Sequence, residues 1–445
     1  MADEERAVKM EEDLSGVVDA RLPEIQSLSE SGKVNEAVDQ LLALEKQTRV
    51  ACDALSTGRV LVAIVSTLFK AKDLKSLNEQ IIFLSKRRGL LKGAIAKMVQ
   101  EASTYVEQIS DMEQKLSLIE TLRTVTAGKI YVEIERARLT RTLAQIREAE
   151  GKIGEAAEVL QELQVETFGS MDRKEKVDFI LEQMRLCLAK QDFIRTQIIS
   201  KKISPKFFDN PDHQELRIRF NQLMIQVEQH DRDHMATSKL YRGIYATSAV
   251  QSDPAQWHAA LQAAVLYLIL APFDNEQSDL LHRTQADKRL KQLPQLESLL
   301  KLFTTAELIN WVDLEATYGA ELRNGDVFAA TEAGAQRWED LKKRVIEHNI
   351  RVISKYYTRI DAARLAELLN LSVLESEKRL SELVVAKTVW ARIDRPSGIV
   401  TFKEVKDPAE RLNQWSRNID SLMHLVDKTT HLIVKEEMVH RIAAK

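Results

Sequence analysis

The sequence predicts an all-α protein with a small β-wing, in which an α-solenoid of helix pairs precedes a winged helix and a long C-terminal helix. Apolar residues recur at helical spacing through most of the 445 residues, and only 14 Gly and 8 Pro interrupt them. A motif repeats in the first half of the chain. The β-favouring segments of the second half are confined to residues 388–403.

The charge balance argues against a nucleic-acid-binding protein. The 64 basic and 67 acidic residues give a net charge of −3, so the chain has no overall positive field, and no block of basic residues supplies a local one. Acidic side chains gather at the N-terminus, where we expect residues 1–20 to form a disordered tail.

Cysteine usage and apolar run lengths indicate a protein without disulfides or membrane spans. Cys52 and Cys187 each lie inside an apolar helical segment, where we expect small buried side chains and a reducing compartment. The longest apolar run, residues 263–271, is shorter than the roughly 20 residues needed to cross a bilayer.

Residues 21–235 are predicted to form helical repeats. Copies of one motif begin about 40 residues apart, or twice that where a copy is missing, and offsets of 2, 5, 9 and 12 from each start are mostly apolar and share one helix face. This period is typical of a TPR- or HEAT-like solenoid, although chance similarity within a helical bundle is the alternative. The copies begin at Gly32, Lys72, Gly151, Gln191 and Asp231.

Residues 236–404 are predicted to form a second domain, whose first part, 236–337, is helical. Thr304 and Glu307 have the spacing of a capping box, which predicts that a helix begins there. Residues 318–334 contain three glycines and are predicted to be a flexible connector.

Residues 338–404 have the order of elements of a winged helix. A long helix is predicted to end at Ile360, and Asp361 and Ser372 are predicted to cap the two helices that follow, the second with Glu375 in a capping box. Two β-favouring segments joined by a hairpin complete the unit. The predicted elements are helices 338–360, 362–369 and 372–385 and strands 388–394 and 399–403.

A winged helix can bind DNA or another protein. The second capped helix carries Lys378 and Arg379, but three glutamates outnumber them, which disfavours contact with phosphates. An exposed wing strand can instead extend the sheet of a neighbour. The wing residues predicted to form such an interface are Val389, Trp390, Arg392, Ile399, Val400 and Phe402.

The last segment, residues 405–445, is predicted to be one helix, with Asp407 as its cap and Pro408 in its first turn. Its apolar residues alternate at spacings of three and four, which predicts a seam for partner helices. Packing against its own domain is the alternative. The seam consists of Leu412, Trp415, Ile419, Leu422, Val426, Thr429 and Ile433.

No catalytic motif is recognisable, so we expect neither an enzyme nor a cofactor. His230 and His234 are four residues apart and could hold zinc from one helix face, but no third ligand is evident and the segment coincides with a predicted turn. A solvated turn is therefore the favoured interpretation, and a metal-dependent hydrolase is the alternative.

Several long segments resemble PCI-domain subunits of the proteasome lid. PCI domains also occur in the constitutive-photomorphogenesis signalosome and in a translation initiation complex. The match spans nearly the whole chain and is clearest in residues 162–171, 179–188, 195–203, 300–311, 344–360 and 428–438.

The resemblance implies a non-catalytic scaffold in ubiquitin-dependent protein degradation, located in the cytoplasm and nucleus. It implies a hetero-oligomer whose winged helix joins other PCI subunits and whose last helix enters a bundle. It further implies contacts of the solenoid with the ATPase base and the core particle, and no nucleic acid, membrane or cofactor. The alternatives are a PCI subunit of, or shared with, the signalosome, and a nucleic-acid-binding winged-helix regulator.

Overall fold

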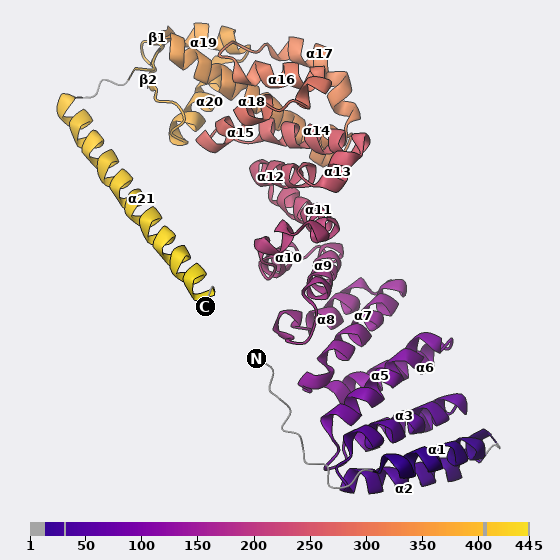
Figure 1. Ribbon diagram of the computed structural model, residues 1–445. Coiled ribbons are helices and arrows are strands. Elements are labelled where there is room, and N and C mark those ends of the chain that lie inside the picture. The colour runs from indigo at the N-terminus through magenta and orange to yellow at the C-terminus, as the bar shows by residue number, and fades with distance from the viewer. Residues whose placement is uncertain (1–13, 31–32, 404–406, 444–445) are drawn as a thin grey trace. The chain divides into compact units, whose positions relative to one another are not determined.

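The computed structural model describes residues 14–30, 33–403 and 407–443 (Figure 1). The chain divides into two compact units, one reaching to Asp233 and including residues 239–257, the other including residues 234–238 and everything from His258. The sequence alternates between the two units from residue 234 to residue 258, so the domain boundary at residue 236 stays a prediction. In the described part, no helix is both long and apolar enough to cross a membrane.

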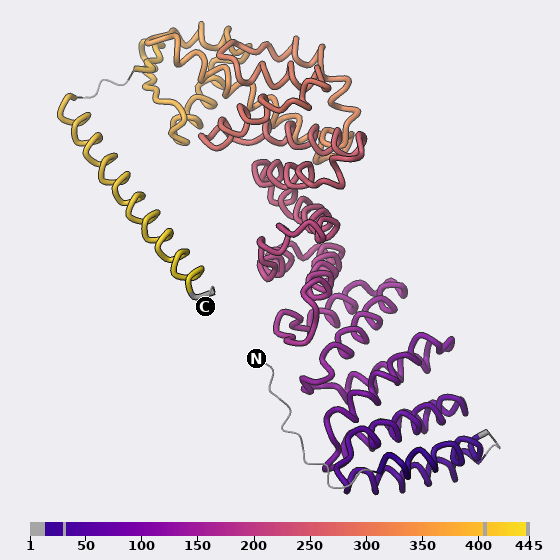
Figure 2. The backbone as a smooth tube through the Cα atoms, viewed as in Figure 1, coloured from indigo at the N-terminus to yellow at the C-terminus, as the bar shows by residue number. Residues whose placement is uncertain are grey.

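The first unit is a series of helices packed on their neighbours, which confirms the predicted solenoid (Figure 2). For example, α3 packs against both α2 and α5, and α9 packs against both α10 and α11. The helices are α1 Ser15–Glu30, α2 Val34–Val50, α3 Ala54–Lys70, α4 Leu74–Ser85, α5 Lys92–Gln108, α6 Met112–Thr126, α7 Glu133–Ala149, α8 Ile153–Gln161, α9 Arg173–Ala189, α10 Phe193–Ser200, α11 Gln214–Asp231 and α13 Ser248–Ser252. Short 3-10 helices lie at η1 Ile130–Val132, η2 Val165–Thr167, η3 Pro205–Asp209 and η4 Pro211–His213.

The repeat starts mark the turns between helices. Lys72, Gly151 and Gln191 have positive φ angles of 59°, 80° and 63°, which end one helix in the left-handed conformation. After Lys72 and Gln191 an aspartate follows and caps the next helix: Asp73 accepts from the Ser76 amide at 3.1 Å, and Asp192 from the Arg195 amide at 3.1 Å. The predicted turns are confirmed at these three positions.

The N-terminal tail was predicted too long. Residues 1–13 lie outside the described residues, but α1 begins at Ser15, and Val18 is fully buried in the core of the first unit. The expectation of disorder is therefore wrong for residues 15–20. The prediction was based on acidic content. It missed the start of α1 because the apolar residues that are buried there lie among polar ones.

The second unit begins with a helical layer. The helices α12 His234–Tyr245 and α14 Pro254–Leu270 contribute residues to both units. They are followed by α15 Asn275–Gln285, η5 Leu290–Gln292, α16 Pro294–Thr304, α17 Trp311–Asn324, η6 Asp326–Phe328 and α18 Glu332–Tyr356.

The predicted helix start at Thr304 is wrong, because Thr304 is the last residue of α16 and its hydroxyl donates to the Leu300 carbonyl at 2.8 Å. The next helix begins instead after Asn310, whose side chain accepts from the Val312 amide at 3.2 Å. Asn349 of α18 holds the intervening chain, since it accepts from the Ile309 amide and donates to the Ile309 carbonyl, both at 2.8 Å. A contact from a distant helix thus overrides a local capping signal.

The connector predicted at residues 318–334 is also wrong, because most of it is helical. Gly319 lies inside α17, and a Cβ there would meet the ring of Trp338 at an ordinary contact distance of 3.8 Å, so this glycine marks no break in the helix. Thr331 caps α18 by accepting from the Gly334 amide at 3.1 Å.

The winged helix follows and is confirmed, with one strand more than predicted. Its elements are β1 Arg359–Asp361, α19 Ala362–Leu369, α20 Val373–Val385, β2 Arg392–Asp394 and β3 Ile399–Thr401. The antiparallel sheet has the order β1-β3-β2, with Ile360 and Ile393 on either side of Val400. The long helix ends at Tyr356, so Ile360 belongs to a strand rather than to the predicted helix.

Of the two helix caps predicted in the winged helix, the one at Ser372 forms its hydrogen bonds and the one at Asp361 does not. The capping box of Ser372 and Glu375 is present in full at the start of α20. Asp361 occupies the cap position of α19, but its side chain makes no capping hydrogen bond. The chain ends in α21 Pro408–Ala443, drawn in yellow in Figure 1.

Candidate interaction surfaces

The seven residues of the predicted seam lie on one face of α21 and are all exposed. Trp415 is 64% exposed, Leu412 62% and Leu422 59%. Every other side chain described in this helix, residues 408–441, is exposed as well. Large apolar side chains exposed this close together make α21 a candidate interaction surface.

A second apolar stripe on α21 was missed in the sequence. Leu425, Leu432 and Val439 are 60%, 53% and 52% exposed and lie seven residues apart, beside the first seam. They could have been found from the sequence, because apolar residues that recur every seven positions beside a seam of three- and four-residue spacing form a second stripe on the same helix. Two adjacent stripes widen the apolar face beyond the narrow seam of a two-stranded coiled coil, which favours contact with more than one partner helix.

The six predicted wing residues divide into two groups. Val389, Val400 and Phe402 are buried in the core of the winged helix, so their side chains cannot reach a partner, and the expectation of a surface role for them is corrected. Trp390, Arg392 and Ile399 are exposed and remain candidates. In β3, strand alternation turns the side chains of Ile399 and Val400 to opposite faces of the sheet.

The third strand changes which edge of the sheet can extend a neighbour. Strand β3 pairs with β1 on one side and with β2 on the other, so Ile399 and Val400 lie on the central strand. Pairing with another chain therefore requires an outer edge, either of β1 or of β2 with Arg392.

Helix α20 presents a face that does not suit nucleic acid. Arg379 pairs with Glu382 at 2.9 Å, and Arg395 of the hairpin pairs with Glu377 at 2.6 Å, so the carboxylates neutralise these basic groups. The same face exposes two apolar residues that the sequence analysis did not single out, Leu374 at 80% and Val385 at 82%. This combination suits a protein surface better than a phosphate backbone.

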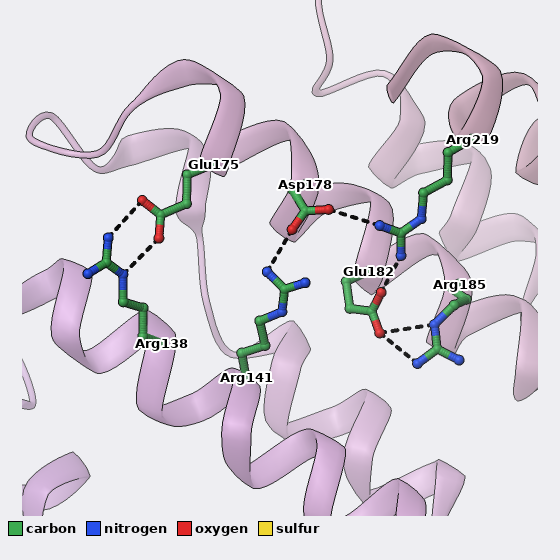
Figure 3. A network of polar contacts seen from close by, with 7 residues as sticks. All are labelled: Arg138, Arg141, Glu175, Asp178, Glu182, Arg185 and Arg219. Atoms are coloured by element: carbon green, nitrogen blue, oxygen red, sulfur yellow. Dashed lines mark hydrogen bonds and ion pairs between the residues drawn. The ribbon is translucent and has the colours of Figure 1, made fainter. Parts of the chain in front are cut away.

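An ionic network ties three helices of the solenoid together (Figure 3). Acidic residues of α9 lie between arginines of α7 and α11, and each acid takes at least one arginine from a neighbouring helix. The contacts are Arg138–Glu175 at 2.8 Å, Arg141–Asp178 at 2.6 Å, Arg219–Asp178 at 2.9 Å, Arg185–Glu182 at 2.6 Å and Arg219–Glu182.

Glu182 is the most buried acid of this network, with a side chain 10% exposed. Burial acts to raise its pKa, but hydrogen bonds and charge from Arg185 and Arg219 outweigh burial, and the pKa lies below its ordinary value. A lowered pKa means that the pairing stabilises the fold fully above the ordinary value of 4.5 and that this stability is lost as pH falls through the folded value.

We expect Glu182→Gln to lower the free energy of unfolding of the first unit by about 2 kcal/mol at pH 7, because two arginines lose their shared carboxylate while remaining partly hydrated. The difference from wild type should shrink at pH 4 and below. Urea unfolding of the full chain at both pH values measures this. Glu158→Gln, which removes an exposed pair with Lys190, is the control and should change little. Equal effects of the two variants would contradict the assignment.

The two histidines weighed as metal ligands have other neighbours. His230 lies 3.1 Å from Asp231 and stacks on Phe193, with ring centroids 3.8 Å apart. His234 lies 3.7 Å from Asp340, and burial lowers its pKa. Throughout residues 14–30, 33–403 and 407–443, no three His, Cys, Asp or Glu side chains are grouped as metal ligands. The turn predicted at this point is present, with Arg232 in the left-handed conformation.

Three family models match the chain in sequence order. The model described as PSMD12/CSN4, N-terminal covers residues 36–253, and the PCI domain model covers residues 317–404. The third, the C-terminal domain of 26S proteasome regulatory subunit RPN5, covers residues 410–441 and so coincides with α21.

Two curated relatives match over almost their whole length. The chain is 48% identical over 434 residues to 26S proteasome non-ATPase regulatory subunit 12 of Dictyostelium discoideum, covering 98% of this chain and 96% of the relative. It is 43% identical over 440 residues to 26S proteasome regulatory subunit RPN5 of Saccharomyces cerevisiae, covering 98% and 99%. COP9 signalosome complex subunit 4 of Drosophila melanogaster is 25% identical over 332 residues, covering 74% and 78%. The chain therefore belongs to the family of 26S proteasome non-ATPase regulatory subunit 12, also called regulatory subunit RPN5.

Proposed function

We propose that this chain is a non-catalytic scaffold subunit of the lid of the proteasome regulatory particle and acts in ubiquitin-dependent protein degradation. In this proposal it works in the cytoplasm and nucleus. Its partners are other PCI and lid subunits, the ATPase base and the core particle. Membership of this family supports the assignment to the proteasome regulatory particle. The exposed apolar residues of α21 and of the winged helix support the scaffold role.

The observation that carries the proposal is the exposed double stripe of α21. Removing a side chain the size of Leu or Val from water contributes about 1.5–3 kcal/mol, so a stripe of this length supplies a large driving force for association. The seam and the second stripe together suit a helical bundle built from several chains. A scaffold needs such surfaces and needs no catalytic group.

The winged helix supplies the second contact in this proposal. An outer edge of its sheet would extend the sheet of a neighbouring PCI subunit, with Trp390, Arg392 and Ile399 near the junction. The apolar residues Leu374 and Val385 of α20 offer a further contact on the same small domain.

The test is purification of the tagged full-length chain at its native expression level, followed by identification of its companions. Subunits of the proteasome regulatory particle should accompany it in stoichiometric amounts. The same experiment addresses a second candidate, a subunit shared with the signalosome, which the joint PSMD12/CSN4 family model favours. Signalosome subunits among the companions would support sharing, and a monomer free of both complexes would overturn the proposal.

A gel shift at low salt separates the scaffold from a nucleic-acid-binding regulator. Lys378 forms no ion pair within the described part of the chain, whereas Arg379 and Arg395 both do. One free cation on this helix supplies too little charge for binding, so we expect no shift of duplex DNA. A shift that weakens with salt and is lost in Lys378→Gln would favour the regulator instead.

A further inference from the structure

A pocket of about 260 Å³ lies in the second unit, lined by residues of α15, α16 and α18 and by Thr388. Its walls carry the cations Arg351 and Lys355, and none of the lining residues described is an Asp or Glu. A lining that carries cations and no carboxylate favours an anion over a cation.

Arg351 is the central cation of this pocket. Its guanidinium lies 3.6 Å from the centre of the Phe273 ring, and its Nε is buried and has no hydrogen-bond partner. The adjacent Glu347 is held by Arg344 at 2.5 Å, so that Arg351 forms no ion pair with any residue that the structure describes. Burial lowers the pKa of Arg351 to about 10, and the group remains charged at neutral pH.

Few other hydrogen-bond donors are free for a ligand. The hydroxyls of Thr304, Ser354 and Thr388 already donate to carbonyl oxygens of the chain. Lys355 is exposed one turn beyond Arg351 and forms no ion pair in the described residues. Ser278 contributes a hydroxyl without a partner there. The exposed imidazole of His282 also lines the pocket, so the donors available to an anion are Arg351, Lys355, Ser278 and His282.

Two further groups restrict the kind of anion. His348 lies 3.1 Å from the Glu307 carbonyl, and burial, followed by the charge of Arg351, lowers its pKa to about 4, so it is neutral at pH 7. The amide nitrogen of Gln277 donates to the Leu268 carbonyl at 3.1 Å, while its Oε1 is buried without a partner. That oxygen can only accept, which suits an anion that carries a hydroxyl of its own.

We propose that this pocket, the Arg351 pocket, binds a phosphoryl group. A singly protonated phosphate offers oxygens to Arg351, Lys355 and Ser278 and a hydroxyl to Gln277 Oε1, whereas sulfate at neutral pH has no hydroxyl to donate. Inorganic phosphate and a phosphorylated side chain share this chemistry. The inference goes beyond the scaffold role and does not depend on it.

The experiment is a calorimetric titration of the full-length protein at pH 6.5 and constant ionic strength with inorganic phosphate, sulfate and O-phosphoserine. We expect saturable binding of phosphate that is at least about tenfold tighter than that of sulfate. Arg351→Gln and Lys355→Gln should each weaken it by about tenfold. Lys342→Gln is the matched control, since Lys342 is exposed on the same helix but does not line the pocket.

The titration results identify the source of the phosphoryl group or overturn the proposed site. Tighter binding of O-phosphoserine than of phosphate assigns the pocket to a phosphorylated protein, and the reverse assigns it to free phosphate. Equal binding of phosphate and sulfate overturns the phosphoryl assignment. Absence of saturable binding at millimolar concentration, or binding that survives in Lys355→Gln, overturns the site. Lys355 is exposed, so its replacement leaves the fold intact.

Discussion

Replacing Leu422 and Val426 of α21 with aspartate is expected to abolish incorporation of the chain into the regulatory particle. In a bundle both side chains would be buried, and burying unpaired carboxylates opposes association far more than losing two apolar contacts. Both positions are exposed here, at 59% and 49%, so the chain on its own should fold as before. Co-purification of regulatory-particle subunits with each tagged variant measures the effect.

A matched control comes from the opposite face of α21. Asn413→Asp with His424→Asp adds the same two negative charges outside both stripes and should leave incorporation unchanged. Leu432→Asp tests the second stripe by itself and should also reduce incorporation, because a multi-chain bundle uses both faces. Incorporation of the Leu422/Val426 variant at the wild-type level would contradict the role assigned to α21.

Gly334→Ala is expected to destabilise the second unit by roughly 1–3 kcal/mol, the range for side chains forced into occupied space. A Cβ at this position would lie 1.9 Å from the Ala329 carbonyl oxygen and 3.1 Å from the Phe328 carbonyl carbon. Both are backbone atoms, so relief requires movement of the turn before α18 and weakens the Thr331 cap. Thermal unfolding of the full chain should show an earlier transition, and limited proteolysis should show cleavage near this turn.

Gly154→Ala is the control for this substitution. Gly154 lies in the first turn of α8, and a Cβ there meets nothing within 4 Å. Alanine should stabilise that helix by up to about 1 kcal/mol, since it reduces the freedom of the unfolded chain. If both variants shifted the transition in the same direction by the same amount, the steric explanation for Gly334 would be wrong.

Features encoded locally could be predicted from the sequence. The left-handed turns at Lys72, Gly151 and Gln191 and the capping box of Ser372 each involve residues within a few positions of one another. Their chemistry is decided by short-range hydrogen bonds, which the spacing of residue types reveals. The apolar seam of α21 was predictable for the same reason, since a single long helix needs no tertiary partner to define its faces.

Features decided by distant contacts could not be predicted. The Thr304 signal was overridden by Asn349, which lies on another helix and holds Ile309 from both sides. Strand β1 is three residues long and follows a helix whose apolar pattern continues into it, so only pairing with β3 reveals it. Which residues of β3 face inward, Val400 among them, depends on that pairing as well.

Hydrogen–deuterium exchange along residues 408–443 is the most direct test of the claim that partner chains cover α21. In the isolated chain, the backbone amides of a helix that nothing covers should exchange rapidly, because only its own hydrogen bonds protect it. In the purified complex, the same amides should exchange more slowly by orders of magnitude. Equal exchange in the two states would show that assembly leaves this helix uncovered and would contradict the account.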